Sequence, residues 1–181
     1  MNFPCPAFFP FAAFALFLTS CSEAPVPEPE VSVDQLSGLT YGAAAEQYDE
    51  RADVRVNVSA ARIDEHWAVI RGVFTPGEAG YHLYSKDLPP EGIENTGRPT
   101  RIEVAEGIVQ TGALLANQEP HDFTQYGVTL PVYHEGPVTL YRLVQPKSGT
   151  SSLTAALTYM SCSKELCNLP IEGETVTVSL P

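Results

Sequence analysis

Basic residues are scarce in this sequence. Its 181 residues include 10 Lys and Arg against 22 Asp and Glu, which gives a formal net charge of -12. A nucleic-acid-binding face needs clustered cations to neutralise phosphates, so the composition argues against a nucleic-acid partner. The same deficit argues against electrostatic attraction to anionic lipid. The acidity instead favours solubility, or a partner whose docking face is basic or neutral.

Metal-ligand spacing is also missing. The four histidines, His66, His82, His121 and His134, form no motif such as H-x3-H. A closed zinc site needs four ligands, and the later cysteine pair offers only two sulfurs. We therefore expect no metal and no cofactor, and we expect the histidines on the surface or at a rim. Neither a Ser-His-Asp arrangement nor a phosphate-binding loop can be argued from the sequence.

Long apolar runs are absent except in a short leader. Residues 1–20 carry no charged side chain, but their apolar core, Phe11 to Leu18, is too short to span a membrane. The leader ends in Leu18-Thr19-Ser20-Cys21, which resembles the lipobox of bacterial lipoproteins. That resemblance implies a signal peptide over residues 1–20, cleavage before Cys21 and lipid attachment to its thiol. An ordinary signal peptide cut nearby is the alternative, and both imply export.

The residues after the leader predict a spacer. Ser22 following the lipidated cysteine resembles the outer-membrane-sorted case, so we expect a lipid-anchored protein of the bacterial cell envelope that faces the periplasm. Prolines at 25, 27 and 29 alternate with Glu28 and Glu30, which predicts an extended Pro/Glu-rich tether over residues 21–35. At ~3.1 Å per residue it would hold the domain roughly 30 Å from its anchor. Residues 36–52 are a connector in which Ala43 to Gln47 favour a short helical turn.

Period-two alternation begins near Asp53 and predicts short strands to the C-terminus. Val54, Val56, Val58 and Ala60 alternate with polar residues, and Asp64-Glu65 makes a tight turn to the next strand. The predicted strands are Val54–Ala60, Trp67–Thr75, Tyr81–Tyr84, Thr100–Val104, Ala113–Leu115, Val128–Tyr133, Val138–Val144, Ser151–Tyr159 and Thr175–Leu180. The sixth and seventh form a hairpin around Glu135-Gly136-Pro137. Such strands with frequent turns predict an all-β sandwich, mostly antiparallel, after a short helical or irregular N-terminal segment.

Cysteine is the scarcest reactive residue in the predicted domain. Cys5 belongs to the leader, and only Cys162 and Cys167 remain for the folded part. They lie between the last two predicted strands, at a sheet rim, where they can face each other within the 4.4–6.8 Å Cα range of disulfides. A ring this small stabilises by only about 2–3 kcal/mol. The pair therefore suits a redox reagent slightly better than a structural staple, and both remain open.

Three stretches together resemble the N-terminal periplasmic domain family of the thiol:disulfide interchange protein DsbD. They are Gly80-Tyr81-His82-Leu83-Tyr84-Ser85-Lys86, then Asp122-Phe123 through Tyr126-Gly127, and Tyr159-x-x-Cys162-x4-Cys167-x-x-Pro170. The likeness covers roughly residues 50–181. It implies an immunoglobulin-like sandwich, here over residues 53–181. It also implies that the domain passes reducing equivalents from a thioredoxin-like or DsbD-like membrane donor to oxidised extracytoplasmic proteins.

The resemblance also implies roles for individual residues. Cys167 would form mixed disulfides and Cys162 would resolve them, with the two joined as a disulfide when oxidised. Tyr81, Tyr84 and Tyr159 would line the site, Asp122 and Glu119 would lie near the pair, and Phe123 and Tyr126 would belong to a cap loop. Lys164 favours the thiolate, whereas Glu165 and the other acids oppose it. No C-x-x-C motif and no membrane-spanning bundle is present, so the donor would be a separate protein.

A second hypothesis keeps the fold and changes the chemistry. In it the chain is a non-catalytic envelope lipoprotein, a binding or scaffolding module whose disulfide is structural.

Overall fold

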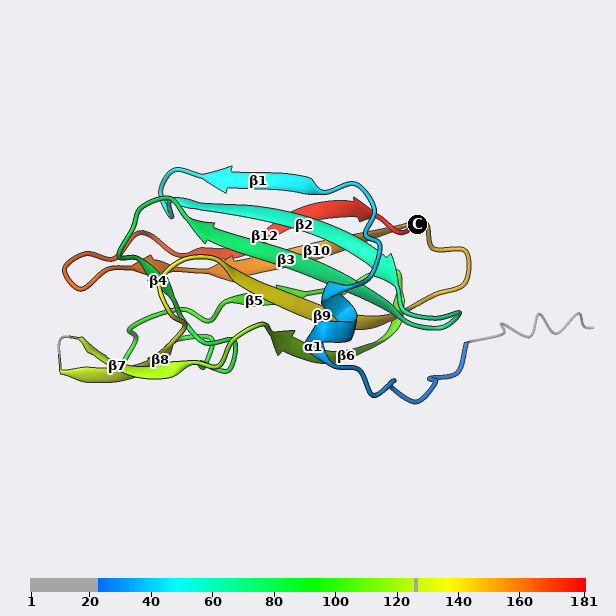
Figure 1. Ribbon diagram of the computed structural model, residues 1–181, viewed down its shortest axis with the longest axis horizontal. Coiled ribbons are helices and arrows are strands. Elements are labelled where there is room, and N and C mark those ends of the chain that lie inside the picture. The colour runs from blue at the N-terminus through cyan, green and yellow to red at the C-terminus, as the bar shows by residue number, and fades with distance from the viewer. Residues whose placement is uncertain (1–22, 126) are drawn as a thin grey trace, which may run out of the picture.

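Alternating apolar residues build two facing β-sheets. The computed structural model describes residues 23–125 and 127–181, and its larger sheet has the strand order β1-β2-β3-β9-β6 and its smaller sheet β12-β10-β5 (Figure 1). The bounds are β1 Ala45–Asp49, β2 Val54–Arg62, β3 Ala68–Pro76, β5 Arg101–Glu103, β6 Ile108–Ala116, β9 Val138–Pro146, β10 Ser152–Tyr159 and β12 Ile171–Ser179. All pairings between these strands are antiparallel. The prediction of an all-β, immunoglobulin-like sandwich is confirmed.

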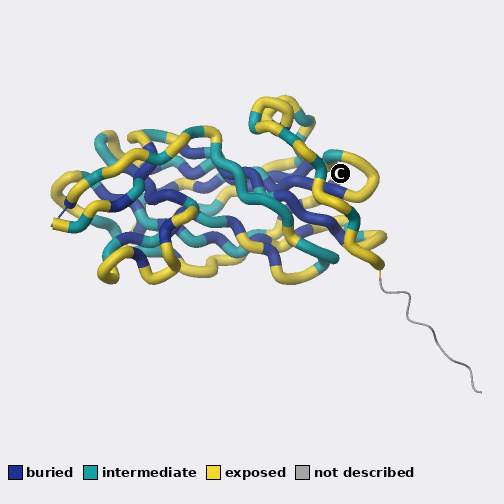
Figure 2. Tube along the Cα trace, turned by 90° about the horizontal axis from the view of Figure 1, so that it is seen from below, coloured by how far each residue is buried: buried dark blue, intermediate teal, exposed yellow. Residues whose placement is uncertain are grey.

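The main core lies between the two sheets. The inward positions predicted from period two are buried on β2, β3 and β10, as Val56, Ile70 and Leu157 illustrate. Figure 2 shows these buried segments running through the middle of the molecule, with the exposed loops around them. One expected polar position differs, because Ser59 on β2 is also buried. The outer face of the larger sheet is therefore covered as well.

The N-terminal segment provides that cover. Helix α1, Val33–Ser37, begins at a capping box in which Ser32 and Gln35 bond reciprocally, and its Leu36 packs on Trp67, Val69 and Leu143 of the sheet. Residues ahead of it are extended, as expected, but they are docked. The contacts are Val26 N–H to Gln145 Oε1 (2.9 Å), Trp67 Nε1–H to Pro27 O (3.0 Å) and Ala113 N–H to Glu28 Oε1 (2.8 Å).

The expectation of a free spacer is therefore wrong from residue 23 onward. An extended, proline-rich segment makes no hydrogen bonds within itself. Its carbonyl oxygens are therefore available to side chains of the domain, as Pro27 O is to Trp67. The helical turn expected at Ala43 to Gln47 is also wrong, because residues from Ala45 form β1. Pairing of β1 with β2 overrides a weak local helix preference. The folded unit thus begins well ahead of residue 53, and Cys21 lies outside the described residues.

Four short strands form an extension at one end of the sandwich. β4 (His82–Leu83) pairs with β11 (Ser161–Cys162), and β7 (His121–Gln125) pairs with β8 (Val128–Val132). A bridge between Tyr84 and Val132 joins the two pairs. The expected hairpin of Val128–Tyr133 with Val138–Val144 is wrong, since β8 pairs with β7 while β9 lies between β3 and β6. The alternation of apolar and polar residues does not reveal which strand pairs with β8, because pairing with β7 or with β9 is equally compatible with it.

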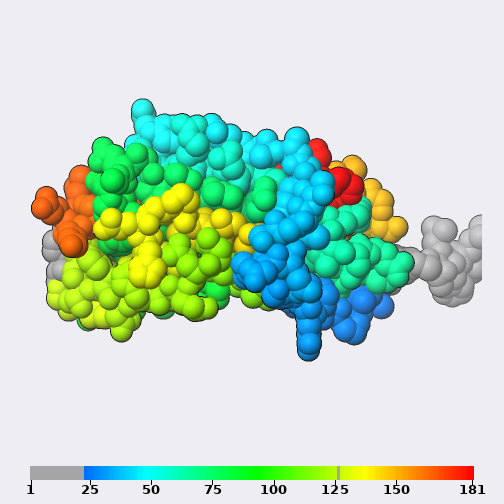
Figure 3. Space-filling model, viewed as in Figure 1, coloured from blue at the N-terminus to red at the C-terminus, as the bar shows by residue number. Residues whose placement is uncertain are grey.

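The extension and the N-terminal segment lie at opposite ends of the long axis. Figure 1 places β4, β7 and β8 at the left, whereas the first described residues and the C-terminus are at the right. The space-filling view in Figure 3 shows the same separation, with the loop after residue 162 in orange at the left tip. Within the two described stretches, no helix is long and apolar enough to cross a bilayer.

Candidate functional site

Cys162 and Cys167 close a small hairpin at this end of the molecule. They are joined by a disulfide, with their Cα atoms 4.0 Å apart, and form a bridge of opposed residues. The flanking backbone hydrogen bonds are Ser163 N–H to Leu166 O (2.8 Å) and Asn168 N–H to Ser161 O (2.9 Å). The cysteines thus occupy the non-hydrogen-bonded position of the hairpin, where facing strands approach most closely. This explains a separation shorter than the range expected from the sequence.

The two sulfurs differ in access. Cys162 is 0% exposed and packs among Tyr84, Leu88, Leu130 and Val132, whereas Cys167 is only partly buried. Exchange requires a thiolate to approach one sulfur in line with the bond that breaks. Of the two cysteines, only Cys167 therefore has surface that faces solvent.

Tyr84 contacts both sulfurs. Its hydroxyl donates to Cys162 Sγ at 2.9 Å and lies 3.8 Å from Cys167 Sγ. Gly97, with φ of +78°, packs on the tyrosine ring, and an added Cβ there would come within 2.9 Å of Tyr84 Cε1. A side chain at residue 97 would therefore push the hydroxyl away from the sulfurs.

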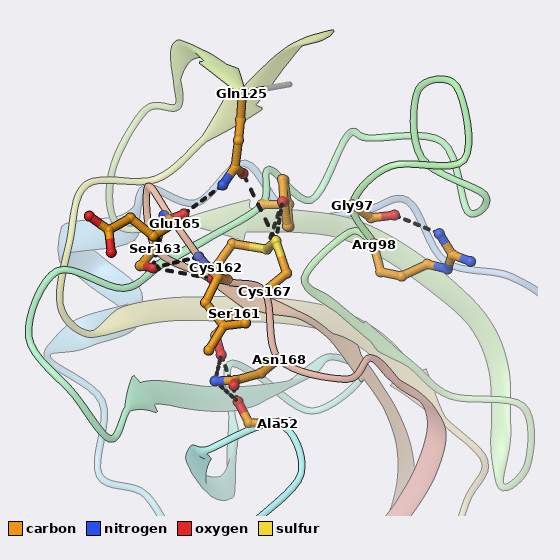
Figure 4. The surroundings of a disulfide bond; sticks show 12 residues. Ala52, Gly97, Arg98, Gln125, Ser161, Cys162, Ser163, Glu165, Cys167 and Asn168 are labelled. Atoms are coloured by element: carbon orange, nitrogen blue, oxygen red, sulfur yellow. Dashed lines mark hydrogen bonds between the residues drawn. A yellow bond between two sulfur atoms is a disulfide. The ribbon is translucent and has the colours of Figure 1, made fainter. Parts of the chain in front are cut away.

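The β7-β8 hairpin forms a cap beside the disulfide. His121, Phe123 and Gln125 alternate along β7, and Gln125 Nε2–H donates to Ser163 O at 2.9 Å while its Oε1 lies 3.9 Å from Cys167 Sγ (Figure 4). Phe123 packs into the cluster around Cys162. The alternate position, Asp122, is exposed. The cap expected as a loop is thus a strand pair, and Gln125 is a contact that the sequence did not indicate.

Hydrogen bonds independent of the disulfide attach the hairpin to the sandwich. Ser161 Oγ–H donates to Ala52 O at 2.6 Å, and Asn168 Nδ2–H donates to the same carbonyl at 3.1 Å and to Ser161 Oγ at 3.0 Å (Figure 4). Leu169 N–H donates to Arg51 O at 3.0 Å. Both arms of the hairpin are therefore held by hydrogen bonds before and after the cysteines, in addition to the sulfur–sulfur bond.

Three histidines gather next to the cap. His121 and His134 are exposed, in line with the expectation of surface or rim positions, whereas His82 is buried and departs from it. His82 is 5% exposed, and its ring lies 4.7 Å from the ring of Phe123. The rings of His121 and His134 stack at 4.4 Å. Burial, and next the neighbouring His121, hold the pKa of His82 below its ordinary value, although Glu135 opposes this. Pairing of β4 with β11 explains why His82 is enclosed: it is the strand partner of Cys162.

The remaining predicted site residues are spread over several environments. Tyr81 and Lys164 line a pocket beside the disulfide turn. Tyr159 is instead a core residue, stacked edge-on against Phe74 at 5.7 Å, and burial raises its pKa to about 12. Glu119 is exposed just ahead of β7. Tyr126 lies outside the described residues, and within the described stretches no group of His, Cys, Asp and Glu could hold a metal ion.

Comparison with known proteins supports the fold. No family model and no curated protein matches the sequence. Among solved structures, the N-terminal periplasmic domain of ScsB from Proteus mirabilis is similar, with a TM-score of 0.51, 14% identity, and coverage of 75% of this chain and 49% of that one. The chain thus spans about half the length of that structure. At this identity the likeness is one of fold.

Two further structures resemble the chain more loosely. The DsbD N-terminal domain of Neisseria meningitidis in the reduced form gives a TM-score of 0.37 at 15% identity, covering 67% of this chain and 88% of that one. The GAE domain of GGA2p from Saccharomyces cerevisiae gives 0.40 at 9% identity, covering 77% and 98%.

Removing the disulfide should leave the fold intact. We expect Cys162→Ser combined with Cys167→Ser to lower the free energy of unfolding by about 2–3 kcal/mol, the value for a small ring. Adding Asn168→Ala should cost about a further 1–3 kcal/mol, because it removes bonds to a buried carbonyl. Urea denaturation measures both. Ser152→Ala, at an exposed position on β10, is the control and should change stability by less than about 0.5 kcal/mol. Failure of the double cysteine variant to fold would show that the bond is a staple.

His82 should make stability depend on pH. Its pKa is lowered in the folded state, so the unfolded chain takes up this proton first as the pH falls below about 6.5. Above that pH the ring is neutral in both states, so it does not change the free energy of unfolding. Below it the unfolded chain binds the proton more readily, and the free energy of unfolding falls. Urea denaturation from pH 7.5 to 5 should show a shallower decline for His82→Gln than for the parent. An NMR titration midpoint for His82 at or above about 6.5 would contradict this.

Proposed function

We propose that this chain is a thiol–disulfide exchange domain in which Cys167 exchanges with partners and Cys162 resolves. The observation that carries the proposal is the difference in access between a partly exposed Cys167 and a wholly buried Cys162. A similar fold in a periplasmic domain supports a location outside the cytoplasm. The donor would be a thioredoxin-like or DsbD-like membrane protein, and the acceptors oxidised extracytoplasmic proteins.

Electrons enter as two thiols of a donor. One donor thiolate attacks Cys167 Sγ, the Cys162–Cys167 bond breaks, and Cys162 departs as a thiolate that takes up a proton. The donor's second thiol then attacks the mixed disulfide, which releases Cys167 and leaves the donor oxidised. In the onward step the Cys167 thiolate attacks a substrate disulfide and forms a mixed disulfide with one substrate sulfur. Cys162 then attacks Cys167 Sγ, re-forms the Cys162–Cys167 bond and releases the reduced substrate. Each half transfers two electrons and two protons.

Tyr84 supports the departure of Cys162. Its hydroxyl is 2.9 Å from the sulfur on which negative charge develops, in a buried site where a donated hydrogen bond is strong. The same hydroxyl lies 3.8 Å from Cys167 Sγ. It is thus placed to serve whichever sulfur carries charge as the bond opens and closes.

The surroundings of Cys167 suit an approaching protein. Leu166 and Leu169 are 58% and 61% exposed, which gives a partner apolar surface on both sides of the reactive sulfur. Lys164 in the turn favours the thiolate. Asp122 and Glu119 are exposed on and ahead of β7, and the Glu165 carboxylate points away from the sulfurs (Figure 4), so none of the three acids is placed to act directly on them.

Attachment to the envelope completes the proposal. A lipid on Cys21 would anchor the chain, with the outer membrane as the favoured location. Because residues 23–31 are docked at the far end of the sandwich, the sulfurs would point away from the anchor (Figure 1).

One observation favours the alternative of an inert binding module. The full burial of Cys162 is also what a structural bridge would show. The two readings differ in whether reduction occurs in the folded protein.

Trapping separates them. Cys162→Ser is first treated with 5,5′-dithiobis(2-nitrobenzoate), which converts Cys167 to a mixed disulfide with thionitrobenzoate. A thioredoxin-like protein whose own resolving cysteine is replaced by serine should then attack Cys167, release thionitrobenzoate and stay attached, because nothing remains to resolve the bond. Cys167→Ser, the matched control, should trap little, since Cys162 is buried. Mass spectrometry of the cross-linked peptides identifies the sulfur. A parent disulfide that dithiothreitol reduces only after unfolding would rule out exchange.

Tyr84→Phe should slow exchange while leaving the fold intact. Loss of a hydrogen bond to a developing thiolate is worth about 1.5–3 kcal/mol, which corresponds to roughly a 10- to 100-fold lower rate with the donor. The Cys162 thiol pKa in the reduced protein should rise in parallel. Tyr159→Phe makes the same change in the core, where the hydroxyl has no partner among the described residues, and should leave the rate unchanged. Equal rates in all three proteins would exclude the role of Tyr84.

A further inference from the structure

Groups that can carry positive charge converge in one pocket of this acidic protein. A pocket of about 390 Å³ beside the cap hairpin is lined by His82, His121, His134 and Lys164. Three of the four histidines in the sequence and one of its 10 lysines and arginines thus meet at one place. The other lining residues include Phe123 of the cap and one acid, Glu135.

The pocket adjoins the disulfide directly. His82 on β4 is the strand partner of Cys162, and Lys164 belongs to the turn between the cysteines. The His82 ring also lies edge-on to the Tyr84 ring, with the two centroids 5.7 Å apart. An occupant of the pocket would therefore be within reach of the same protein that exchanges with Cys167.

One polar atom of the pocket is left without a partner. His82 Nε2 is buried and has no hydrogen-bond partner among the described residues, although a buried polar group ordinarily has one. Burial and His121 hold the pKa of His82 low, so the ring is neutral near pH 7 and can donate one N–H to an acceptor. Lys164 supplies a full positive charge, and the stacked rings of His121 and His134 lie on the other side.

An anionic oxygen acceptor suits this lining. A carboxylate offers an acceptor to Lys164 and to the imidazole groups of His121 and His134, and its negative charge complements that of the lysine. We propose that this pocket binds a carboxylate, supplied by an Asp or Glu side chain of the protein that exchanges with Cys167. The identity of this partner rests on the proposed function, because the partner is the protein proposed to exchange with Cys167. Elsewhere a chain with a net charge of -12 repels acidic proteins, so the pocket would select the docking orientation.

Binding should strengthen as the pH falls. Glu135 lines the same pocket and partly offsets its positive groups, so a bound carboxylate competes with it until a histidine is protonated. A protonated imidazole binds a carboxylate more strongly than a neutral one, so the affinity for a carboxylate should be higher at pH 6.0 than at pH 7.5.

The test uses the oxidised protein and probes that carry no thiol, so no exchange occurs during the titration. Histidine ring signals are followed by NMR while N-acetyl-Gly-Glu-Gly-amide, N-acetyl-Gly-Gln-Gly-amide or acetate is added. We expect the Glu peptide to shift the signals of His82, His121 and His134 saturably, more tightly at pH 6.0, and the Gln peptide to have little effect. Acetate, the free carboxylate, should bind more weakly than the Glu peptide.

Variants make the result specific to the pocket. His121→Gln and Lys164→Met should each weaken the Glu peptide at least threefold, whereas His66→Gln, at an exposed turn outside this pocket, should not. Equal binding of the Glu and Gln peptides, or binding unaffected by either pocket variant, would overturn the proposal. Acetate binding as tightly as the peptide would overturn the assignment to a protein side chain. Because exchange is assayed separately, its failure with carboxylate binding intact would reject only the proposed function.

Discussion

The carbonyl oxygen of Ala52 is the point on which the disulfide-bearing end of the molecule depends. It accepts hydrogen bonds from Ser161 and Asn168, one on each arm of the disulfide hairpin. A buried carbonyl with two donors is costly to abandon. The hairpin is thus fixed to the turn before β2 by bonds that persist when the sulfurs separate. A reagent that must open and close needs such a support, because otherwise each turnover would loosen the structure that positions it.

The extension at this end also links features that are far apart in sequence. The bridge between Tyr84 and Val132 joins the β4-β11 pair to the β7-β8 cap. Tyr84 contacts the sulfurs, Gln125 of the cap bonds to the turn between them, and His82 connects both to the neighbouring pocket. The disulfide, its covering hairpin and the neighbouring pocket are therefore all built on these two linked strand pairs at one end of the sandwich.

Sequence reasoning reached the sandwich and the cysteine hairpin, because both have strong local signals. Val54 to Ala60 alternate without interruption, and Tyr159 and Cys162 lie at the end of an equally regular strand. It placed the aromatic residues less well. Tyr84 contacts the sulfurs, whereas Tyr159 is core, and the side on which a residue of a short strand falls depends on register. The histidine cluster was missed for a related reason: His82, His121 and His134 belong to segments brought together only by the pairing of β4, β8 and β7. The histidine-to-glutamine alternation from 121 to 125 was the available signal.

The docked N-terminal segment gives the domain a direction. Residues 23–31 run along the outer face of the larger sheet and leave it at the end remote from Cys167. The first described residues and the disulfide therefore lie at opposite ends of the sandwich. If the proposed anchor precedes Glu23, the length of the sandwich, more than slack in the chain, would set how far from the membrane a partner meets Cys167.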